Sequence, residues 1–277
     1  MKRFKVFSYS FVSIFALLWL FPFAVMLITI TKNSDQFVEN FFWYIPPIQE
    51  IPINIFNNAL NALFKGDILA GMVNSLLYAS VAAIVAAIIT SLAGYALVHL
   101  NVKYPQSIFF VLFGGNLLPY QMFLLPLYLG SVSIGLYDTR IALLLVYIGI
   151  CVPFALLVQR NYASNVPGEL LEAARLDGCN SLEIYTKIFL PLTKSAFLAV
   201  FVLDFTWVWN NLIFGMVLTE DVRPIMSTIS RLTPSGRGYI GPPVIIMGSI
   251  LASIPTMIIF VALHRYFIEG FAIGTSK

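Results

Sequence analysis

The ionisable residues of this sequence are few, and one of them stands alone in an apolar segment. Asp204 is the only acid or base between Ser195 and Thr219. If this segment spans a membrane, a charge at its centre costs about 2.5–3.5 kcal/mol on insertion scales, so the residue should face a cavity, a partner helix or another subunit. Asp204 is therefore a candidate transport-path or gating residue. A structural hydrogen bond within a helix bundle is the alternative.

Aromatic and amide side chains follow Asp204 one to two turns later. Trp209, Asn210 and Asn211 suit a sugar, because its CH face can stack on a ring while its hydroxyl groups bond to amides. An interfacial tryptophan with capping amides is an alternative of equal weight. Weaker candidates for the same role are Asn74, Asn116 and Gln121.

Metal-binding and catalytic patterns are missing from the sequence. His99 and His264 each stand without further ligands, so no metal site is expected. The two cysteines, Cys151 and Cys179, fall in segments expected in the membrane and in the cytosol, which excludes a disulfide framework and zinc spacing. No nucleophile elbow, phosphate-binding loop or carboxylate pair is present. The chain is predicted to have no catalytic residues.

Composition indicates the environment that must hold these residues. Of the 277 residues, 59% are hydrophobic and 10% are charged, whereas a soluble domain carries about 25% charged residues. A chain so poor in charge cannot cover its surface in water, so it is predicted to lie in a membrane. The net charge of +3 is too small to indicate a nucleic acid as a partner.

Six segments are apolar enough to cross a bilayer as helices, which takes about 20 residues each. The expected spans are residues 8–30, 70–98, 107–130, 140–159, 194–218 and 241–264. Helices are required because backbone polar groups find no partners in lipid, and the runs lack the alternation of β-barrel strands. The predicted fold class is an all-α integral membrane protein with six transmembrane helices, and residues 1–277 are predicted to form a single domain.

Lys and Arg residues set the expected orientation. Ten of the sixteen lie on the side of the N-terminus and of the 160–194 loop. Because cytoplasmic loops carry the excess of positive charge, both termini and this loop are predicted to be cytoplasmic. The opening MKRFK and its apolar run are interpreted as a retained first helix, since the run is too long for a signal peptide. The connections at 32–67 and 220–237 are then external, and the first carries aromatic residues that suit the headgroup region.

One face of the cytoplasmic loop is built from small residues. Leu170, Ala173 and Ala174 have the spacing of neighbours on a helix. Two alanines there would leave a shallow surface that another protein can approach closely. Glu169 and Glu172 suit the positive end of this helix's dipole. A plain solvated connection between two spans is the alternative.

A turn and a second short helix are expected after this face. Gly178 stands where a left-handed C-cap is required. Asn180 with Glu183 predicts a capping box, and Glu183 can pair with Lys187 one turn later. Pro191 marks the break before the fifth span. The expected shape is helix, glycine turn and helix, lying beneath the membrane.

The residues of this loop match a known signature. The match consists of Glu172-Ala173-Ala174, three residues, Gly178, nine residues, and Ile188-Phe189-Leu190-Pro191. It resembles the EAA motif, EAA-x3-G-x9-I-x-LP, of the membrane subunits of bacterial ABC importers. Pro167, Leu170 and Asp177 also match the wider version found in the sugar-importing branch.

The resemblance extends along most of the chain. Further matching segments are Asn74-Ser75, Pro119-Tyr120-Gln121, Leu125-Pro126-Leu127-Tyr128, Trp209-Asn210-Asn211 and His264 to Gly270. Together they resemble the smaller permease subunit of maltose-type carbohydrate importers. The resemblance implies the architecture of a type I ABC importer permease in a bacterial or archaeal cytoplasmic (inner) membrane.

In that family the EAA helix is a coupling helix that docks in a cleft of a cytoplasmic ATPase subunit. The resemblance implies that Glu172 makes the charged contact, that Ala173 and Ala174 allow close packing, and that Gly178 sets the turn. Asp177, Ile188, Leu190 and Pro191 complete the expected coupling residues. ATP closes the ATPase dimer, and the spans then switch from inward-facing to outward-facing.

The resemblance also implies a set of partners. These are a second homologous permease, two ATPase subunits that bind ATP and Mg, and an extracytoplasmic solute-binding protein. This chain would bind no cofactor, and the larger permease would make most sugar contacts. The 220–237 loop corresponds to the family's external loop toward the binding protein, and residues 270–277 to a tail that reaches the ATPases.

Two other transporter readings stay open. An importer of the same build could carry another solute, such as glycerol phosphate, although the spans contain no Lys or Arg beyond their first residues, Arg140 and Lys194, that would favour phosphate. An ion-coupled transporter working alone would need several ionisable groups within its spans, and only Asp204 is present. A membrane-embedded enzyme lacks a catalytic cluster.

Overall fold

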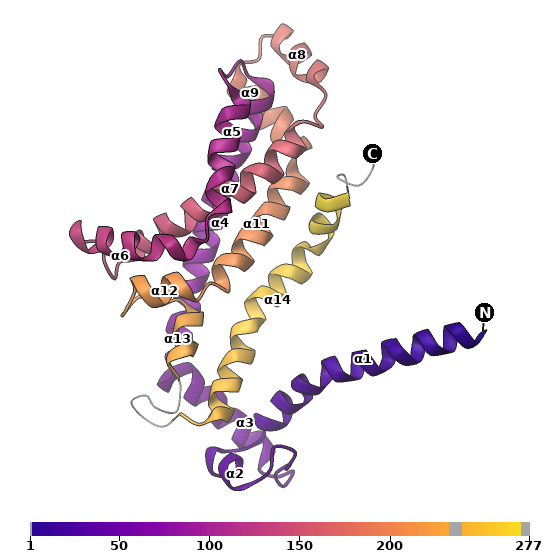
Figure 1. The fold of residues 1–277 in the computed structure, drawn as a ribbon, viewed down its shortest axis with the longest axis vertical. Helices are drawn as coiled ribbons and strands as arrows, with labels where there is room; N and C mark the ends of the chain where they lie inside the picture. The colour runs from indigo at the N-terminus through magenta and orange to yellow at the C-terminus, as the bar shows by residue number, and fades with distance from the viewer. Residues whose placement is uncertain (1, 233–239, 273–277) are drawn as a thin grey trace. The chain divides into compact units, whose positions relative to one another are not determined.

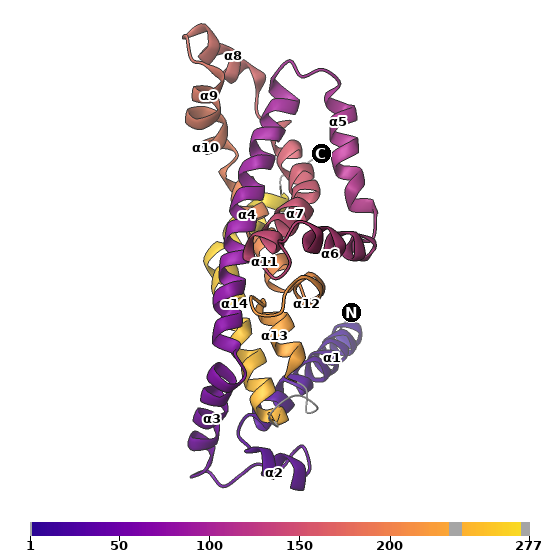
Figure 2. The same ribbon diagram turned by 90° about the vertical axis from the view of Figure 1, so that its left-hand side faces the viewer.

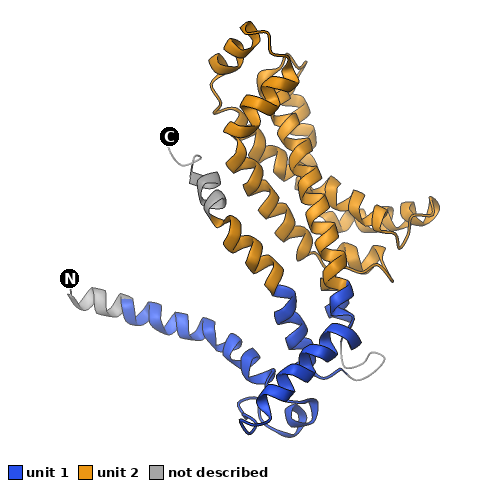
Figure 3. Cartoon of the chain, turned by 180° about the vertical axis from the view of Figure 1, so that it is seen from behind, with its two compact units in different colours: residues 1–70, 228–253 blue, residues 71–227, 254–277 orange. Residues whose placement is uncertain are grey.

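The computed structural model describes residues 2–232 and 240–272, with side chains described for 9–232 and 240–264. All regular structure in these ranges is helical. The chain divides into two units, residues 1–70 with 228–253 and residues 71–227 with 254–277 (Figure 3). Part of the expected external loop, 233–239, and the end of the expected tail, 273–277, lie outside the described residues.

The first unit begins with α1 (Lys2–Thr29), α2 (Ser34–Glu39), α3 (Ile51–Leu60) and the π-helical turn η1 (Asn61–Lys65). Buried polar groups hold the chain that follows α1. Asn58 donates hydrogen bonds to the carbonyls of Ile30 and Lys32, at 3.0 and 2.8 Å. The buried Lys32 ammonium donates to the carbonyls of Phe41 and Phe42, at 3.0 and 2.9 Å. These bonds satisfy charges and amides that burial would otherwise penalise.

The second unit is built around three long helices. α4 (Ile68–His99) buries a row of alanines, and α7 (Arg140–Ala163) packs against both α5 (Pro105–Gly114) and α11 (Lys194–Trp209). A side chain at Gly94 of α4 would come within 3.2 Å of the α7 backbone at Gln159 and Arg160. Small residues thus let these helices approach closely, as is common in membranes.

The remaining elements of the second unit are shorter. They are η2 (Gly115–Leu117), η3 (Tyr120–Phe123), α6 (Leu124–Ser133), α8 (Gly168–Leu176), α9 (Ser181–Ile184), η4 (Tyr185–Phe189), α10 (Leu190–Leu192) and α12 (Ile213–Leu218). α13 (Ile225–Arg231) begins in the second unit and ends in the first. α8 and α9 lie beyond the C-terminal end of α4 (Figure 1). α14 (Pro242–Ala272) runs through both units.

Four expected spans correspond to uninterrupted helices that are long and apolar enough to cross a membrane. They are Tyr9–Thr29, Ile68–His99, Arg140–Ala163 and Pro242–His264. The number among the described residues rises to six if each of two bent helix pairs is one span. The cytoplasmic placement of both termini stays a prediction.

The expected span at 107–130 corresponds to a bent helix pair, because the chain turns by 88° between Pro105–Leu117 and Tyr120–Ser133 (Figure 2). α5 ends at Gly114, and Pro119 cannot donate the backbone bond that a continuous helix needs. The expected span at 194–218 is also interrupted, since α11 ends at Trp209 and α12 starts at Ile213. α11 instead forms the second bent pair with Ser181–Leu192, at 76°.

Candidate functional site

The 160–194 loop folds as the expected elbow of two helices. α8 ends before Gly178, whose φ of +87° is the left-handed conformation that glycine adopts at low cost. The Asn180 side chain accepts the N–H groups of Leu182 and Glu183, and the Glu183 carboxylate accepts the N–H of Asn180. The predicted turn and capping box are therefore confirmed.

An exposed ion pair follows the capping box. Lys187 Nζ lies 3.0 Å from Glu183 Oε1, one helical turn away. The Asn180 N–H bond, together with Lys187, holds the pKa of Glu183 below its usual range. The bond to Glu183 raises the pKa of Lys187. Because both groups are exposed, the pair contributes little stability and mainly favours the local helix.

The inner face of the elbow packs onto the second unit. Buried residues from α4, α7, α8, α9 and η4 form one apolar cluster, which we call the inner cluster: Tyr95, Ala163, Leu171, Ala174, Ile184, Tyr185 and Phe189. The rings of Tyr95 and Phe189 lie 4.9 Å apart. Because the cluster takes side chains from both sides of the glycine turn, it fixes the angle of the elbow as well as its position.

Hydrogen bonds attach the elbow to the ends of α4 and α7. Arg175 Nη2 donates to the carbonyl of His99 at 2.9 Å, and the His99 ring Nε2 lies 2.8 Å from the carbonyl of Ala163. The Tyr185 hydroxyl donates to Ser91 Oγ at 3.1 Å. These carbonyls belong to the C-terminal ends of helices, where no intrahelical donor remains. Arg175 of the elbow thus satisfies the open carbonyl of α4, and the His99 ring of α4 lies against the open carbonyl of α7.

The predicted shared face of Leu170, Ala173 and Ala174 needs a correction. Ala174 is buried in the inner cluster with Leu171, from which it is separated by one turn. Leu170 and Ala173 are exposed, and the outer face continues to Leu176, which is 90% exposed. The i, i+3 spacing of Leu171 and Ala174 already carried this signal.

The other expected coupling residues divide between the two faces. Glu172, Asp177, Gly178 and Pro191 are exposed. Ile188 and Leu190 are partly buried and pack against the inner cluster. The elbow therefore presents a charged and apolar outer surface on a rigid inner support.

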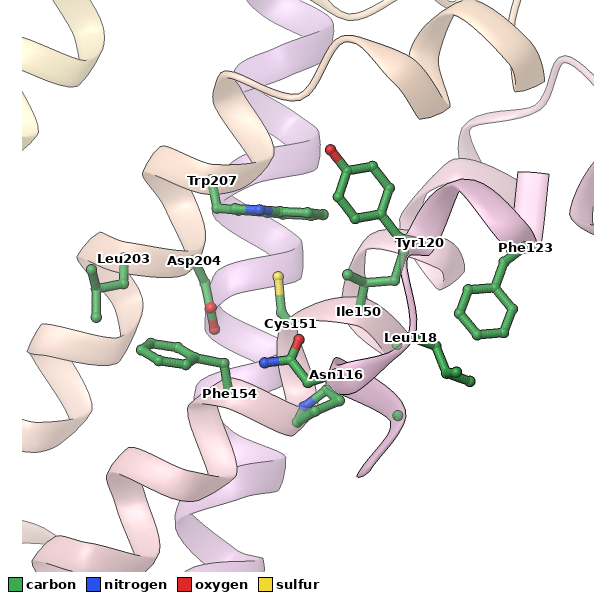
Figure 4. Close-up of a pocket in the computed structure, with 13 residues that line it drawn as sticks. Asn116, Leu118, Tyr120, Phe123, Ile150, Cys151, Phe154, Leu203, Asp204 and Trp207 are labelled. Atoms are coloured by element: carbon green, nitrogen blue, oxygen red, sulfur yellow. The ribbon is translucent and has the colours of Figure 1, made fainter. Parts of the chain in front are cut away.

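A second candidate site is a cavity of about 650 Å³ in the second unit. It lies at the bend between α5 and α6, and α7 and α11 complete its walls (Figure 4). Its main polar and aromatic lining residues are Asn116, Tyr120, Cys151, Asp204 and Trp207. Non-helical backbone at membrane depth is tolerated where it lines a cavity or is buried in protein, so the bend and the cavity explain each other.

Asp204 is the most unusual group in this cavity. The residue is 4% exposed, and its Oδ2 atom has no hydrogen-bond partner among the residues that the structure describes. The Cys151 thiol lines the same cavity (Figure 4). Figure 4 shows the carboxyl pointing toward the space between Cys151 and Phe154. The unpartnered oxygen leaves an acceptor that a hydroxyl group or a water molecule could satisfy.

Most other predicted path residues lie outside the cavity lining. Trp209 is buried against Phe205, with ring centres 5.7 Å apart. Asn210 Nδ2 donates to the Thr206 carbonyl, and Asn211 Oδ1 accepts the N–H of Phe214.

Gln121 is exposed, and Asn74 bonds to Arg140 and to the carbonyl of Arg223.

The sequence reasoning missed Trp207 and Tyr120 as a pair. Their rings lie 6.2 Å apart at 87° in the cavity wall. Trp207 follows Asp204 by three residues, so the two side chains share a helix face. Trp209, five residues after Asp204, points elsewhere. Spacing from the acid, rather than the Trp-Asn-Asn string, was the usable signal.

Comparison with known proteins gives a consistent picture. The model of the family described as "Binding-protein-dependent transport system inner membrane component" matches residues 98–271. The arabinooligosaccharides transport system permease protein AraQ of Bacillus subtilis is 30% identical over 268 residues, which cover 95% of this chain and 92% of AraQ. The lactose transport system permease protein LacG of Rhizobium radiobacter is 27% identical over 265 residues, 95% of this chain and 93% of LacG.

A solved structure shares the fold. It belongs to a bacterial ABC transporter involved in the import of the acidic polysaccharide alginate. The TM-score is 0.79 at 22% sequence identity, and the match covers 96% of this chain and 97% of the other.

Proposed function

Because the chain belongs to the family of binding-protein-dependent transport system inner membrane components, we propose that it is a membrane-spanning subunit of an ATP-driven importer for a sugar or oligosaccharide. It forms the translocation path with a second, homologous permease. Two cytoplasmic ATPase subunits hold ATP and Mg and carry out the hydrolysis, and an extracytoplasmic binding protein delivers the solute. The complex lies in a bacterial or archaeal cytoplasmic membrane, with both termini of this chain inside.

One observation carries the proposal: the elbow is apolar on both faces, and the described residues of the chain cover only one of them. Leu171 and Ala174 pack into the inner cluster, whereas Leu170 and Leu176 are 49% and 90% exposed. This loop is expected outside the bilayer, where exposed leucines at adjacent turns indicate a protein contact. A cleft on an ATPase subunit would cover this face, and Glu172 beside it would supply a charged contact.

The contacts beneath the elbow give a route for movement. A displacement of α8 is passed to α4 through Arg175 and the inner cluster, and to α7 through the bond between His99 and Ala163. It reaches α11 through η4 and α10, which lead directly into that helix. Three long helices that line or support the cavity would thus respond to one docked element.

The cavity supports a carbohydrate path. Trp207 and Tyr120 offer ring faces for the CH surface of a sugar, and Asn116 and Asp204 offer partners for hydroxyl groups. The described lining contains neither Lys nor Arg. That composition favours a neutral sugar over a phosphorylated solute, which stays the alternative for an importer of the same build.

The proposal is tested by charge reversal at the elbow. The complex is reconstituted with Glu172→Lys, and ATP hydrolysis and sugar uptake are measured with the loaded binding protein. We expect uptake to be lost, because the docked ATPase faces the wrong charge, while the fold is unaffected since the side chain is exposed. Glu39→Lys, an exposed acid of α2, is the matched control.

Uptake that survives Glu172→Lys would remove the assigned coupling role. Uptake by the wild-type chain in vesicles without ATPase subunits would remove the importer proposal itself and would favour an ion-coupled transporter.

A further inference from the structure

A polar clasp lies at the end of the second unit opposite the elbow, and neither the coupling role nor the cavity uses it. Between α12 and α13 the chain runs through residues 219–224, which we call the strap. Side chains from α4 and from the connection between α6 and α7 bind the backbone of this strap. The same stretch leads into the predicted external loop.

Asp138 is the centre of the clasp. Its Oδ1 accepts the backbone N–H groups of Glu220 at 2.7 Å, Asp221 at 3.0 Å and Val222 at 3.4 Å, and its Oδ2 lies 3.2 Å from the N–H of Asp221. The Asp138 N–H donates to the carbonyl of Leu218 at 3.2 Å. One residue therefore bonds to the strap through its side chain and to the end of α12 through its backbone.

The backbone of Asp138 indicates that this geometry is held in place. Its φ is +55°, in the left-handed region that residues with a side chain seldom adopt. Aspartate is among the residues that tolerate this region best. Thr139 then caps α7 by accepting the N–H of Ala142, so the turn that carries Asp138 is fixed to a long helix.

Residues of α4 bind the other half of the strap. The buried Tyr78 hydroxyl donates to the carbonyl of Val222 at 2.8 Å, and Ser75 Oγ accepts the N–H of Ile225 at 2.8 Å. Asn74 Nδ2 donates to the carbonyl of Arg223 at 3.1 Å, while its Oδ1 accepts from Arg140 Nη2 at 3.2 Å. Asn74, chosen from the sequence as a path residue, is here engaged on both sides of its amide.

The clasp recognises backbone atoms and not side chains. It therefore fixes the course of the strap whatever residues the strap carries outward. Side chains that served only to fill the core would not need hydrogen bonds to the strap, whereas four side-chain atoms bond to its backbone: Asp138 Oδ1 and Oδ2, the Tyr78 hydroxyl and Asn74 Nδ2. Such an arrangement suits a loop whose position must be accurate while its outer surface meets a partner.

The geometry points to Asp138 as a positioning residue for the external loop, with Asn74 and Tyr78 in support. The inference rests on the proposed function, in that the partner met by the loop is the extracytoplasmic binding protein. Asp138 itself does not touch that partner. It holds the strap at the start of the loop, so that the binding protein meets a preformed surface and no binding free energy is spent on ordering it.

The experiment uses the whole complex in nanodiscs, together with its extracytoplasmic binding protein. ATP hydrolysis is measured as the loaded binding protein is titrated. We expect Asp138→Ala to raise the half-maximal concentration by about tenfold, which corresponds to the loss of one charge-assisted bond. The maximal and basal rates should stay close to wild type. Asp138→Asn keeps an acceptor oxygen, so its half-maximal concentration should lie between those of wild type and Asp138→Ala.

Hydrogen exchange supplies a second readout. The N–H groups of residues 220–222 should exchange faster in Asp138→Ala than in wild type, because their acceptor is gone. Asp35→Ala removes an exposed acid from α2, outside the clasp, and serves as the control for charge. Tyr78→Phe deletes a single donor and should give a smaller shift in the same direction.

An unchanged half-maximal concentration in Asp138→Ala would overturn the inference, as would unchanged exchange at residues 220–222. Equal loss of assembly in Asp138→Ala and Asp138→Asn would also overturn it, since the residue would then serve the fold alone. A wild-type complex that no binding protein stimulates would instead refute the proposed function.

Discussion

Replacing Gly178 by alanine tests whether the angle of the elbow matters, apart from its chemistry. The φ of +87° at this residue is one that an L side chain adopts only at a cost of roughly 1–2 kcal/mol. No atom lies within 4 Å of the added methyl group. The penalty is therefore conformational and local, with no clash to distort the inner cluster.

A penalty of about 1–2 kcal/mol changes the ratio between the native turn and its competitors by a factor of roughly 5–30. Docking on the ATPase requires the native turn, so the affinity between the two should fall by up to that factor. Gly168→Ala is the matched control, because it adds the same methyl group, meets no atom within 4 Å and lies at the start of α8. Alanine in a helix is preferred over glycine.

In the assay, ATPase subunits are titrated onto the permease pair in nanodiscs, and both their binding and the resulting sugar uptake are measured. We expect Gly178→Ala to bind at least fivefold more weakly than wild type, and Gly168→Ala to bind as well as wild type. Equal affinities for the two variants would show that the left-handed turn is not needed for coupling, and the reasoning would be refuted.

Three further outcomes follow from the described contacts. Leu171→Ala should destabilise the elbow by about 2–5 kcal/mol, seen as faster hydrogen exchange in α8, whereas the exposed Leu176→Ala should not; equal exchange would contradict the inner cluster. Trp207→Ala should slow sugar uptake with little change in melting temperature, and the buried Trp209→Ala should lower the melting temperature; the reverse pattern would contradict the cavity assignment. Burial disfavours the charged form of Asp138, but the backbone N–H bonds and Arg223 outweigh burial and lower the pKa of this carboxyl. The charged carboxyl should therefore stabilise the strap equally from pH 8 to 5. This stabilisation should be lost as the pH falls below about 4 and through the folded pKa. Glu220, Tyr137, Tyr78 and Arg140 also lie near this carboxyl, and a loss of binding-protein affinity already at pH 6 would assign the effect to another group.

The elbow was the most predictable part of the molecule, because its signals are local. Gly178, Asn180 and Glu183 each follow a rule that involves residues at most four apart, and each adopts the expected conformation. The burial of Ala174 depends on Tyr95 and Phe189, which lie far away in the sequence. Periodicity identified the helix, but only the packing showed which face is turned inward.

The apolar segments were predictable in position, and the helices inside them were less predictable in shape. Charge-free runs mark membrane segments whether or not the helix inside them continues. Gly114, Gly115 and Pro119 were visible breakers within such a run, yet a length criterion takes no account of them. The same limit applies to the cavity, whose residues come from α7, α11 and the segment 115–123 at the 88° bend.

The π-helical turn at Tyr185–Phe189 gives the elbow a particular tolerance to changes in length. A π turn holds one residue more than the α-helical register around it. Deleting one residue there lets the turn close as an ordinary α turn, and the residues before and after keep their facing. A deletion within α8 or α11 would instead rotate everything beyond it by about 100°. Natural length variation in this connection should therefore concentrate at the π turn.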